Sequence, residues 1–179
     1  QNVEAILREL NAEDGRIQLS HQKIEPEHLA VLYNMADCTI NISDAEGFGL
    51  ATLESLSCET PIIVNMTGGL QEQVTDGKNW FGIGIEPSSK AVIGSPEVPF
   101  IYEDRISKED FHAALDKMYN MSREKRQKMG KLGAKHVNKN YNFQKLSEKW
   151  VQIMDDIHNR YGSWETRKGY DRWVKTEIL

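Results

Sequence analysis

The chain has 179 residues, which is enough for one domain with its own core or for part of a larger enzyme. Its 22 basic and 27 acidic residues give a net charge of −5 without a basic block, which argues against a nucleic-acid partner. No apolar run approaches the ~20 residues that span a bilayer, and we expect no signal peptide. Two cysteines, Cys38 and Cys58, are too few for a disulfide framework and predict reduced, buried thiols in a cytoplasmic protein. The start at Gln1 without a methionine predicts a fragment of a longer chain.

Helical and strand patterns alternate through residues 1–85. Apolar spacing predicts helices at 2–11, 26–36 and 49–58, with a short helical piece ending at 74. Short apolar runs predict strands at 16–20, 38–43, 61–65 and 81–85. This alternation predicts an α/β fold with a Rossmann-like, doubly wound parallel sheet, which binds ligands outside the carboxyl ends of its strands. We expect segments 20–24, 43–49 and 66–69 at that edge.

The rest of the chain is predicted to be mostly helical. Residues 86–100 hold three of the five prolines and predict a long loop that is either functional or mobile. Capping signals predict helices from 107 to 119 and from 122 to 138. A third helix is expected at 142–159, with an apolar stripe formed by Phe143, Leu146, Trp150, Ile153, Met154 and Ile157. The tail 160–179 is aromatic and modestly basic.

A glycine-rich turn joins the predicted strand 38–43 to the predicted helix 49–58. Gly47 and Gly49 permit positive φ angles and a close approach of a ligand to the backbone. The first amide groups of the helix have no partner within it, and its dipole favours negative charge there. A phosphate or diphosphate is therefore a natural ligand, although a plain turn fits the two glycines equally well. The sequence is not a Walker loop, because no Lys-Ser/Thr pair follows.

Two glutamates, Glu46 and Glu54, flank this turn with seven residues between them. Ionised carboxylates only accept hydrogen bonds, so two of them beside a phosphate would repel it unless each binds hydroxyl groups. A nucleotide sugar offers hydroxyls on the ribose and on the sugar with a diphosphate between them. From the residues alone, a solvated helix position for Glu54 and a charge at the helix N-terminus for Glu46 stay open.

The stretch EGFGLATLESLSCETPIIVNMTGGLQEQVTDGKN, residues 46–79, carries several motifs in a characteristic order. It closely resembles the signature region of the retaining GT-B glycosyltransferases of family 4, the glycosyl transferases group 1. The matching features are the two spaced glutamates, a Thr-Pro pair before a strand, a Gly-Gly turn with a nearby glutamate, and an Asp-Gly-x-Asn turn: Glu46, Glu54, Thr60, Pro61, Gly68, Gly69, Glu72, Asp76, Gly77 and Asn79. The resemblance covers residues 1–85 well and the helical remainder loosely.

The resemblance implies a role for each matching residue. Glu54 would bind the ribose hydroxyls, and Glu46, the implied catalytic residue, would bind the donor sugar. The backbone amides of four residues would meet the sugar and the diphosphate: Gly47, Phe48, Gly49 and Leu50. The base of a UDP-, GDP- or ADP-sugar would face a strand end, largely through backbone groups of His21, Gln22, Lys23 and Ile24. The implied reaction transfers the sugar to a hydroxyl of a glycan, lipid or protein acceptor with retention, and needs no metal or other cofactor.

The chain departs from the family pattern in three ways. Glu59 and Trp80 stand where the family often has glycine. The acceptor domain and the first strand of the nucleotide domain, with its Arg and Lys against the diphosphate, are absent. We therefore expect the isolated chain to be inactive and to need its N-terminal domain or a partner chain. The expected division is a partial nucleotide-sugar-binding domain at 1–140, followed by a helix and tail at 141–179.

The function of the tail and the class of the protein have alternatives. Residues 164–179 would dock against the missing N-terminal domain or make a peripheral contact with an anionic membrane. The chain could also be a non-catalytic binding or assembly module that complements a partner chain. A nucleotide-sugar epimerase is a further alternative, which the Gly-Phe-Gly turn between the two spaced glutamates disfavours.

Overall fold

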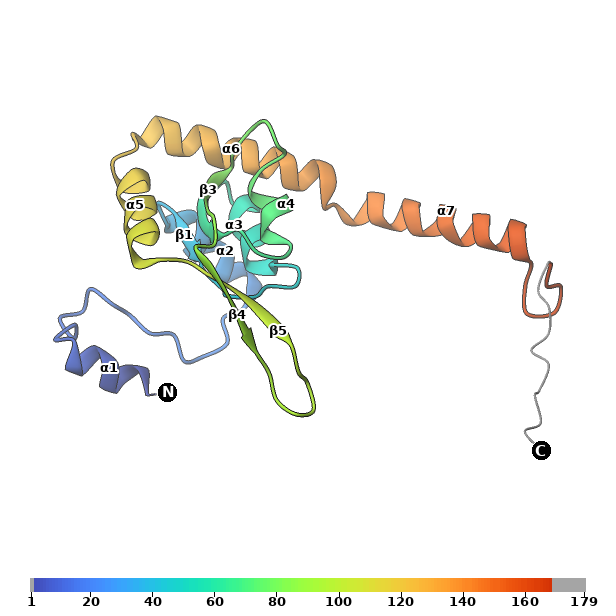
Figure 1. Ribbon diagram of the computed structural model, residues 1–179. Coiled ribbons are helices and arrows are strands. Elements are labelled where there is room, and N and C mark those ends of the chain that lie inside the picture. The colour runs from blue at the N-terminus through green and yellow to red at the C-terminus, as the bar shows by residue number, and fades with distance from the viewer. Residues whose placement is uncertain (1, 169–179) are drawn as a thin grey trace.

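A three-stranded parallel sheet forms the centre of the molecule in the computed structural model, which describes residues 2–168 (Figure 1). The strands are β1 (Thr39–Asn41), β2 (Ile62–Asn65) and β3 (Gly82–Ile85), in the order β1-β2-β3. Every residue of β2 is buried, as its continuous apolar run predicts for a central strand. The parallel pairing confirms the predicted Rossmann-like α/β class.

Helices cover both faces of the sheet. One core cluster joins β2 to α3 (Leu50–Ser57), α4 (Leu70–Val74) and α6 (Arg123–Asn140). The other joins β2 and β3 to α5 (Lys108–Tyr119). A further helix, α2 (Pro26–Met35), begins at its proline, as predicted. The sheet thus has a core on each side, as a doubly wound fold requires.

Two serines cap the helices that follow the sheet. The side chain of Ser107 accepts a hydrogen bond from the backbone N–H of Asp110 at the start of α5. Ser122 does the same for the N–H of Lys125 at the start of α6. Both caps confirm helix starts that the sequence predicts, because each serine satisfies an N–H with no partner in the first turn.

Helix α6 packs very closely against the end of α3. A Cβ atom added at Gly130 would overlap the backbone carbonyl of Glu59. Glu59 itself has φ +59°, in the left-handed region that favours glycine. Glu59 thus stands where the family often has glycine, and its backbone adopts a conformation that favours glycine.

The N-terminal segment differs from the sequence prediction. Helix α1 (Val3–Glu9) forms within the expected range, but none of its residues is buried. The predicted strand at 16–20 is wrong, because these residues are irregular and exposed. A strand is stable only when a neighbour pairs with it, and no strand of the described part of the chain lies beside this segment.

The predicted loop at 86–100 is also wrong in part. Residues Ser89–Ile93 form β4, which pairs antiparallel with β5 (Ile101–Arg105). The resulting hairpin projects from the sheet in Figure 1, and its connection at 94–100 holds Pro96 and Pro99. Proline is confined to edges and turns of sheets, so the prolines mark the turn of a hairpin here and not a structureless loop.

The last described helix, α7 (Phe143–Tyr161), extends away from the sheet (Figure 1). It follows α6 after a short joint, near the predicted boundary at 140, and none of its residues is buried. The predicted apolar stripe is exposed along its whole length. No helix among residues 2–168 is long and apolar enough to cross a bilayer. Most of the basic tail, residues 169–179, lies outside the described residues.

Candidate functional site

The glutamate–glycine turn, residues 43–49, leaves the carboxyl end of β1 and enters α3, as predicted. Gly49 occupies the N-cap of α3 with φ +86°, which a residue with a side chain rarely adopts. A Cβ atom at this position would lie 2.5 Å from Cδ2 of Leu70 and 3.1 Å from Oε1 of Gln73. The backbone conformation and the lack of space both require glycine.

The N-terminal end of α3 presents backbone N–H groups. No side chain caps this helix. Within residues 2–168, no protein group accepts a hydrogen bond from the N–H of Leu50 or Ala51. Because the helix dipole adds a partial positive charge at this end, the turn is suited to an anionic group.

A second glycine turn, Gly68–Gly69, lies directly against the first. The N–H of Gly69 donates a hydrogen bond of 3.1 Å to the carbonyl of Gly47. Gly68 has φ +48°, and a Cβ atom there would overlap the carbonyl of Glu46. The turns after β1 and β2 therefore form one backbone surface at the carboxyl edge of the sheet, where the sequence predicts both.

The two glutamates have different surroundings. The side chain of Glu46 is half-buried in the turn, whereas Glu54 is exposed on α3. The hydroxyl of Tyr33, from α2, donates a 3.0 Å hydrogen bond to Oε2 of Glu54. Burial, that hydrogen bond and the charge of Glu54 raise the pKa of Tyr33 to about 12. Glu54 is therefore held by a neutral phenol, and its other oxygen has no protein partner in the described chain.

An apolar cavity of about 340 Å³ adjoins Glu54. It lies between α2, α3 and α6, and its wall includes Pro26, Leu29, Tyr33 and Leu53. A concave, mostly apolar site with a few polar groups is typical of small-molecule binding. The carboxylate of Glu54 is one of the polar groups that line this cavity.

A buried glutamine forms a hydrogen bond with the glutamate–glycine turn. The Nε2 group of Gln73, on α4, donates to the carbonyl of Phe48. Its Oε1 is buried and has no hydrogen-bond partner in the described residues. The ring of Phe48 meets Tyr141 edge-on, with the ring centres 6.0 Å apart. The turn is thus contacted by side chains from α4 and from Tyr141, the residue that follows α6.

Six of the predicted site residues come together at this edge: Glu46, Gly47, Phe48, Gly49, Leu50 and Glu54. The other four, His21, Gln22, Lys23 and Ile24, do not follow a strand. They lie in the irregular segment before α2, where His21 approaches Glu4 of α1 at 3.6 Å between two exposed side chains. Their predicted position at a strand end is therefore wrong, because the strand itself does not form.

Tyr33, Asn65 and Asp104 also belong to this region, although the sequence alone does not predict them there. Asn65, fully buried at the end of β2, donates to the carbonyls of Ser43 and Asp104 at 2.9 and 2.7 Å. A polar residue that ends a continuous apolar run is a signal that could have found Asn65. Nothing in the sequence brings Tyr33 to Glu54, because their contact depends on how α2 packs on α3.

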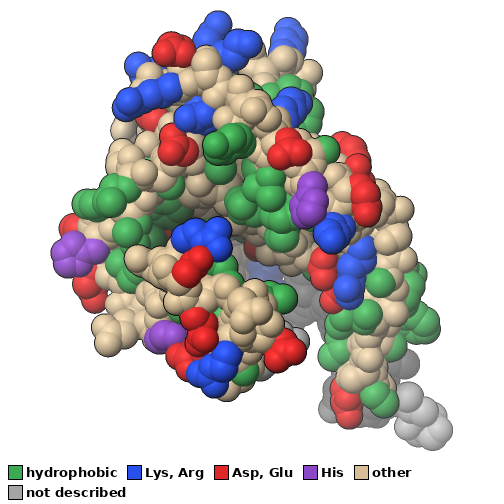
Figure 2. Space-filling model, turned by 90° about the vertical axis from the view of Figure 1, so that its left-hand side faces the viewer, with side chains coloured by type: hydrophobic (Ala, Val, Ile, Leu, Met, Phe, Trp, Pro, Cys, Tyr) green, Lys and Arg blue, Asp and Glu red, His purple; other side chains and the backbone are tan. Residues whose placement is uncertain are grey.

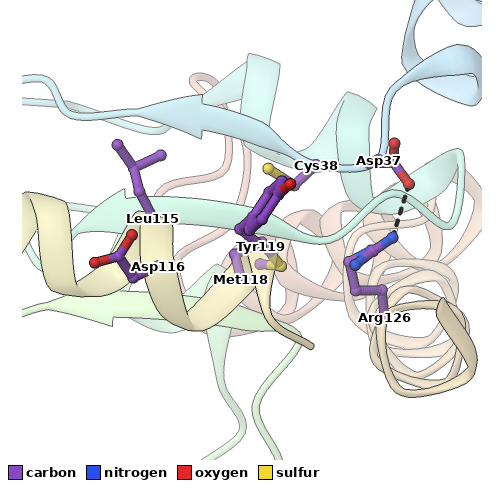
Figure 3. Close-up of a pocket in the computed structure, with 7 residues that line it drawn as sticks. All are labelled: Asp37, Cys38, Leu115, Asp116, Met118, Tyr119 and Arg126. Carbon is purple, nitrogen blue, oxygen red and sulfur yellow. Dashed lines mark hydrogen bonds and ion pairs between the residues drawn. The ribbon is translucent and has the colours of Figure 1, made fainter. Parts of the chain in front are cut away.

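A different cavity, of about 440 Å³, lies at the amino end of β1 (Figure 3). Cys38, Leu115, Met118 and Tyr119 form its apolar wall, and beside them Arg126 pairs with Asp37 at 3.0 Å. Burial raises the pKa of the Cys38 thiol, so it stays protonated near neutral pH. This cavity is at the opposite end of the strands from the glutamate–glycine turn and is not part of that site.

The two cysteines are free thiols in the structure and only half-buried, where the sequence predicts buried ones.

Figure 2 shows the face at the left of Figure 1, where hydrophobic side chains gather around a central hollow. Among the described residues, no group of three or more His, Cys, Asp or Glu side chains is placed to hold a metal ion.

Comparison with known proteins identifies the family. The family model for glycosyl transferases group 1 matches residues 2–136. The chain belongs to this family. The match includes both glycine turns, both glutamates and the helices α1 to α5 with most of α6. Tyr141, which packs on Phe48, lies just beyond it.

Several curated relatives of this glycosyltransferase family are D-inositol 3-phosphate glycosyltransferases. The chain is 43% identical over 54 residues to the one from Acidothermus cellulolyticus, covering 30% of this chain and 12% of that protein. It is 29% identical over 94 residues to the one from an Arthrobacter species, covering 52% and 22% respectively. The chain thus spans at most about a fifth of the length of these relatives.

Two solved structures share the fold. Sucrose-phosphate synthase from Thermosynechococcus elongatus aligns with a TM-score of 0.68 at 24% identity, over 88% of this chain and 34% of that one. The catalytic domain of starch synthase IV from Arabidopsis thaliana, bound to ADP and acarbose, aligns with a TM-score of 0.60 at 16% identity, over 88% and 29%. At these identities the likeness establishes the fold, and the chain corresponds to about a third of each structure.

Proposed function

We propose that this chain is the donor-binding half of a retaining glycosyltransferase, which transfers a hexose-like sugar from a nucleotide sugar to an acceptor hydroxyl. One observation carries the proposal. Glu46, the free amides at the start of α3, and Glu54 lie along one edge, beside an apolar cavity. A nucleotide sugar has the same four chemical parts in order: sugar hydroxyls, diphosphate, ribose hydroxyls and base.

Each part of the donor has a fitting partner on this edge. The cavity walled by Leu29 and Leu53 would take the base, and Glu54 would accept hydrogen bonds from the ribose hydroxyls. The amides at the start of α3 would meet the diphosphate, and Glu46 would hold the sugar. Residues 21–24 run directly into α2, whose first residues line the cavity, which supports their proposed backbone contacts with the base.

The chemistry of transfer requires more positive charge than this edge supplies. The departing diphosphate must be stabilised, and the start of α3 offers only amides and a helix dipole. We therefore propose that the isolated chain does not turn over, and that an N-terminal domain or a partner chain completes the active site. The proposed setting is cytoplasmic, with the tail docked on that second domain or in peripheral contact with a membrane.

Calorimetry with UDP, GDP, ADP and their sugars tests the donor site. We expect one nucleotide series to bind the wild-type chain and the Glu59→Ala variant, and the Glu54→Ala variant to lose binding. Glu59 is the matched control, because it is a carboxylate close to Glu54 in the chain that lines a different cavity, near the amino end of β2. Unchanged affinity in Glu54→Ala would contradict the proposed ribose contact, and turnover by the isolated chain would contradict the need for a second half.

The exposed apolar stripe of α7 favours a second candidate, a non-catalytic assembly module that binds nucleotides only with its partner chain. The same titrations separate the two. Nucleotide binding by the chain alone supports the donor site, whereas binding that requires the added partner domain supports the assembly module.

A further inference from the structure

The β4–β5 hairpin is attached to the candidate site at its root. The N–H of Asp104, in β5, donates a 2.7 Å hydrogen bond to the carbonyl of Asp44 in the glutamate–glycine turn. The buried side chain of Asn65 donates to the carbonyls of Asp104 and Ser43 at once. Hydrogen bonds to backbone carbonyls therefore join the hairpin root to the end of β2 and to the turn before Glu46.

The carboxylate of Asp104 makes two further contacts. Its Oδ2 accepts a 2.8 Å hydrogen bond from Oγ1 of Thr67, and its Oδ1 lies 3.1 Å from Nζ of Lys90, its cross-strand partner in β4. The hydrogen bond from Thr67 and the contact with Lys90 lower the pKa of Asp104, so the group is charged at neutral pH. Arg105, the next residue, pairs with Asp44 at 3.4 Å.

These contacts link the two turns that form the backbone surface of the site. Thr67 directly precedes the Gly68–Gly69 turn, and Asp44 lies two residues before Glu46. Asp104 touches both, through its carboxylate on one side and its N–H on the other. A single residue of the hairpin thus bridges the turn after β1 and the turn after β2.

We propose that Asp104 is a positioning residue of the donor site, which holds the glutamate–glycine turn against the Gly68–Gly69 turn so that Glu46 faces the donor sugar. The proposal rests on the donor site proposed above. The hairpin root would act on the sugar end of the donor only, because Glu54 and the apolar cavity lie beside α2 and α6. The hairpin is then part of the site and not a surface insertion.

Hydrogen exchange of the free chain tests the positioning role without any ligand. The N–H of Gly69, bonded to the carbonyl of Gly47, should exchange about tenfold faster in Asp104→Ala, because the turns separate more often. The N–H of Ile63, in the centre of β2, should be unaffected. The control is Glu97→Ala, which removes a carboxylate at the hairpin tip that accepts a hydrogen bond from Ser95, and should change neither amide.

The conservative variant Asp104→Asn keeps an oxygen for Thr67 and should restore most of the protection of Gly69. In titrations, Asp104→Ala should weaken the nucleotide sugar about tenfold and the nucleoside diphosphate less than twofold. Unchanged exchange at Gly69, or equal acceleration at Gly69 and Ile63, would overturn the positioning role. If Asp104→Ala accelerates exchange at Gly69 but the wild-type chain binds no nucleotide, the contact between the turns is correct and the donor site is refuted instead.

Discussion

The sheet and the helices packed on it contrast with the segments at the two ends of the described chain. The sheet body contains both core clusters, and Leu56, Ile63 and Val64 have no exposed surface at all. Helices α1 and α7 have apolar residues at helical spacing but bury none of them. The candidate site thus lies on the part of the chain that has its own core. We propose that the apolar faces of the end helices contact another domain or chain.

The largest expected difference between the two regions is in the free energy of unfolding. Leu56→Ala, in the core, should lower it by roughly 2–5 kcal/mol, because the substitution removes buried apolar atoms and leaves a cavity. Leu146→Ala, on exposed α7, should change it by less than about 0.5 kcal/mol. Urea unfolding of both variants measures this. Equal losses of unfolding free energy in the two variants would show that α7 is part of the folded body, which would contradict the contrast between the two regions.

A smaller effect is expected where α6 meets the turn after α3. Gly130→Ala should cost about 1–3 kcal/mol of unfolding free energy, because its Cβ would overlap the carbonyl of Glu59. Alanine has the higher helix propensity, so a gain in stability would show that the two elements are not in contact. Lys131→Ala and Lys131→Gly, at an exposed position of the same helix, provide a reference for propensity alone.

The hydrogen bond between Tyr33 and Glu54 predicts a pH dependence of stability. Tyr33 has a folded pKa of about 12 against an ordinary value of 10.0, so the neutral phenol is favoured in the folded chain. Its contribution is complete below pH 10 and is lost as the pH rises from about 10 to about 12. Unfolding measured at about pH 8 and about pH 11 should show a larger loss for wild type than for Tyr33→Phe. Identical losses of stability in the two proteins would contradict the hydrogen bond between Tyr33 and Glu54.

The smallest expected effect is at Glu59. Its φ of +59° costs a residue with a side chain roughly 1 kcal/mol, which glycine avoids at the expense of greater freedom in the unfolded chain. Glu59→Gly should therefore raise the unfolding temperature by a few degrees at most. The control is Glu148→Gly on α7, which should lower helix content by circular dichroism without changing the main unfolding transition.

The sequence predicts what local patterns determine. The apolar run of β2, the capping serines of α5 and α6, and the glycines before α3 each have a structural cause within a few residues, and all are found where expected. The turns at 43–49 and 66–69 were also correctly expected at the carboxyl edge, because parallel strands end at the same side of a sheet.

Features that depend on distant partners were not predicted. The strand expected at 16–20 has no neighbour in the described chain, and local apolarity cannot reveal that. The hairpin was hidden by Pro96 and Pro99, which suggest a loop as readily as a turn. The contacts of Tyr33 with Glu54 and of Asp104 with Thr67 join residues 21 and 37 positions apart, which only the packing of the fold brings together.

The most direct test of the proposed donor site compares two glutamates against two ligands. With the nucleoside diphosphate that the wild-type chain binds and with its sugar conjugate, Glu54→Gln should weaken both about tenfold, because both contain the ribose. Glu46→Gln should weaken only the sugar conjugate, because only that ligand carries the sugar hydroxyls that Glu46 would bind. Equal loss of both ligands in Glu46→Gln, or no loss of either in Glu54→Gln, would contradict the proposed orientation of the donor.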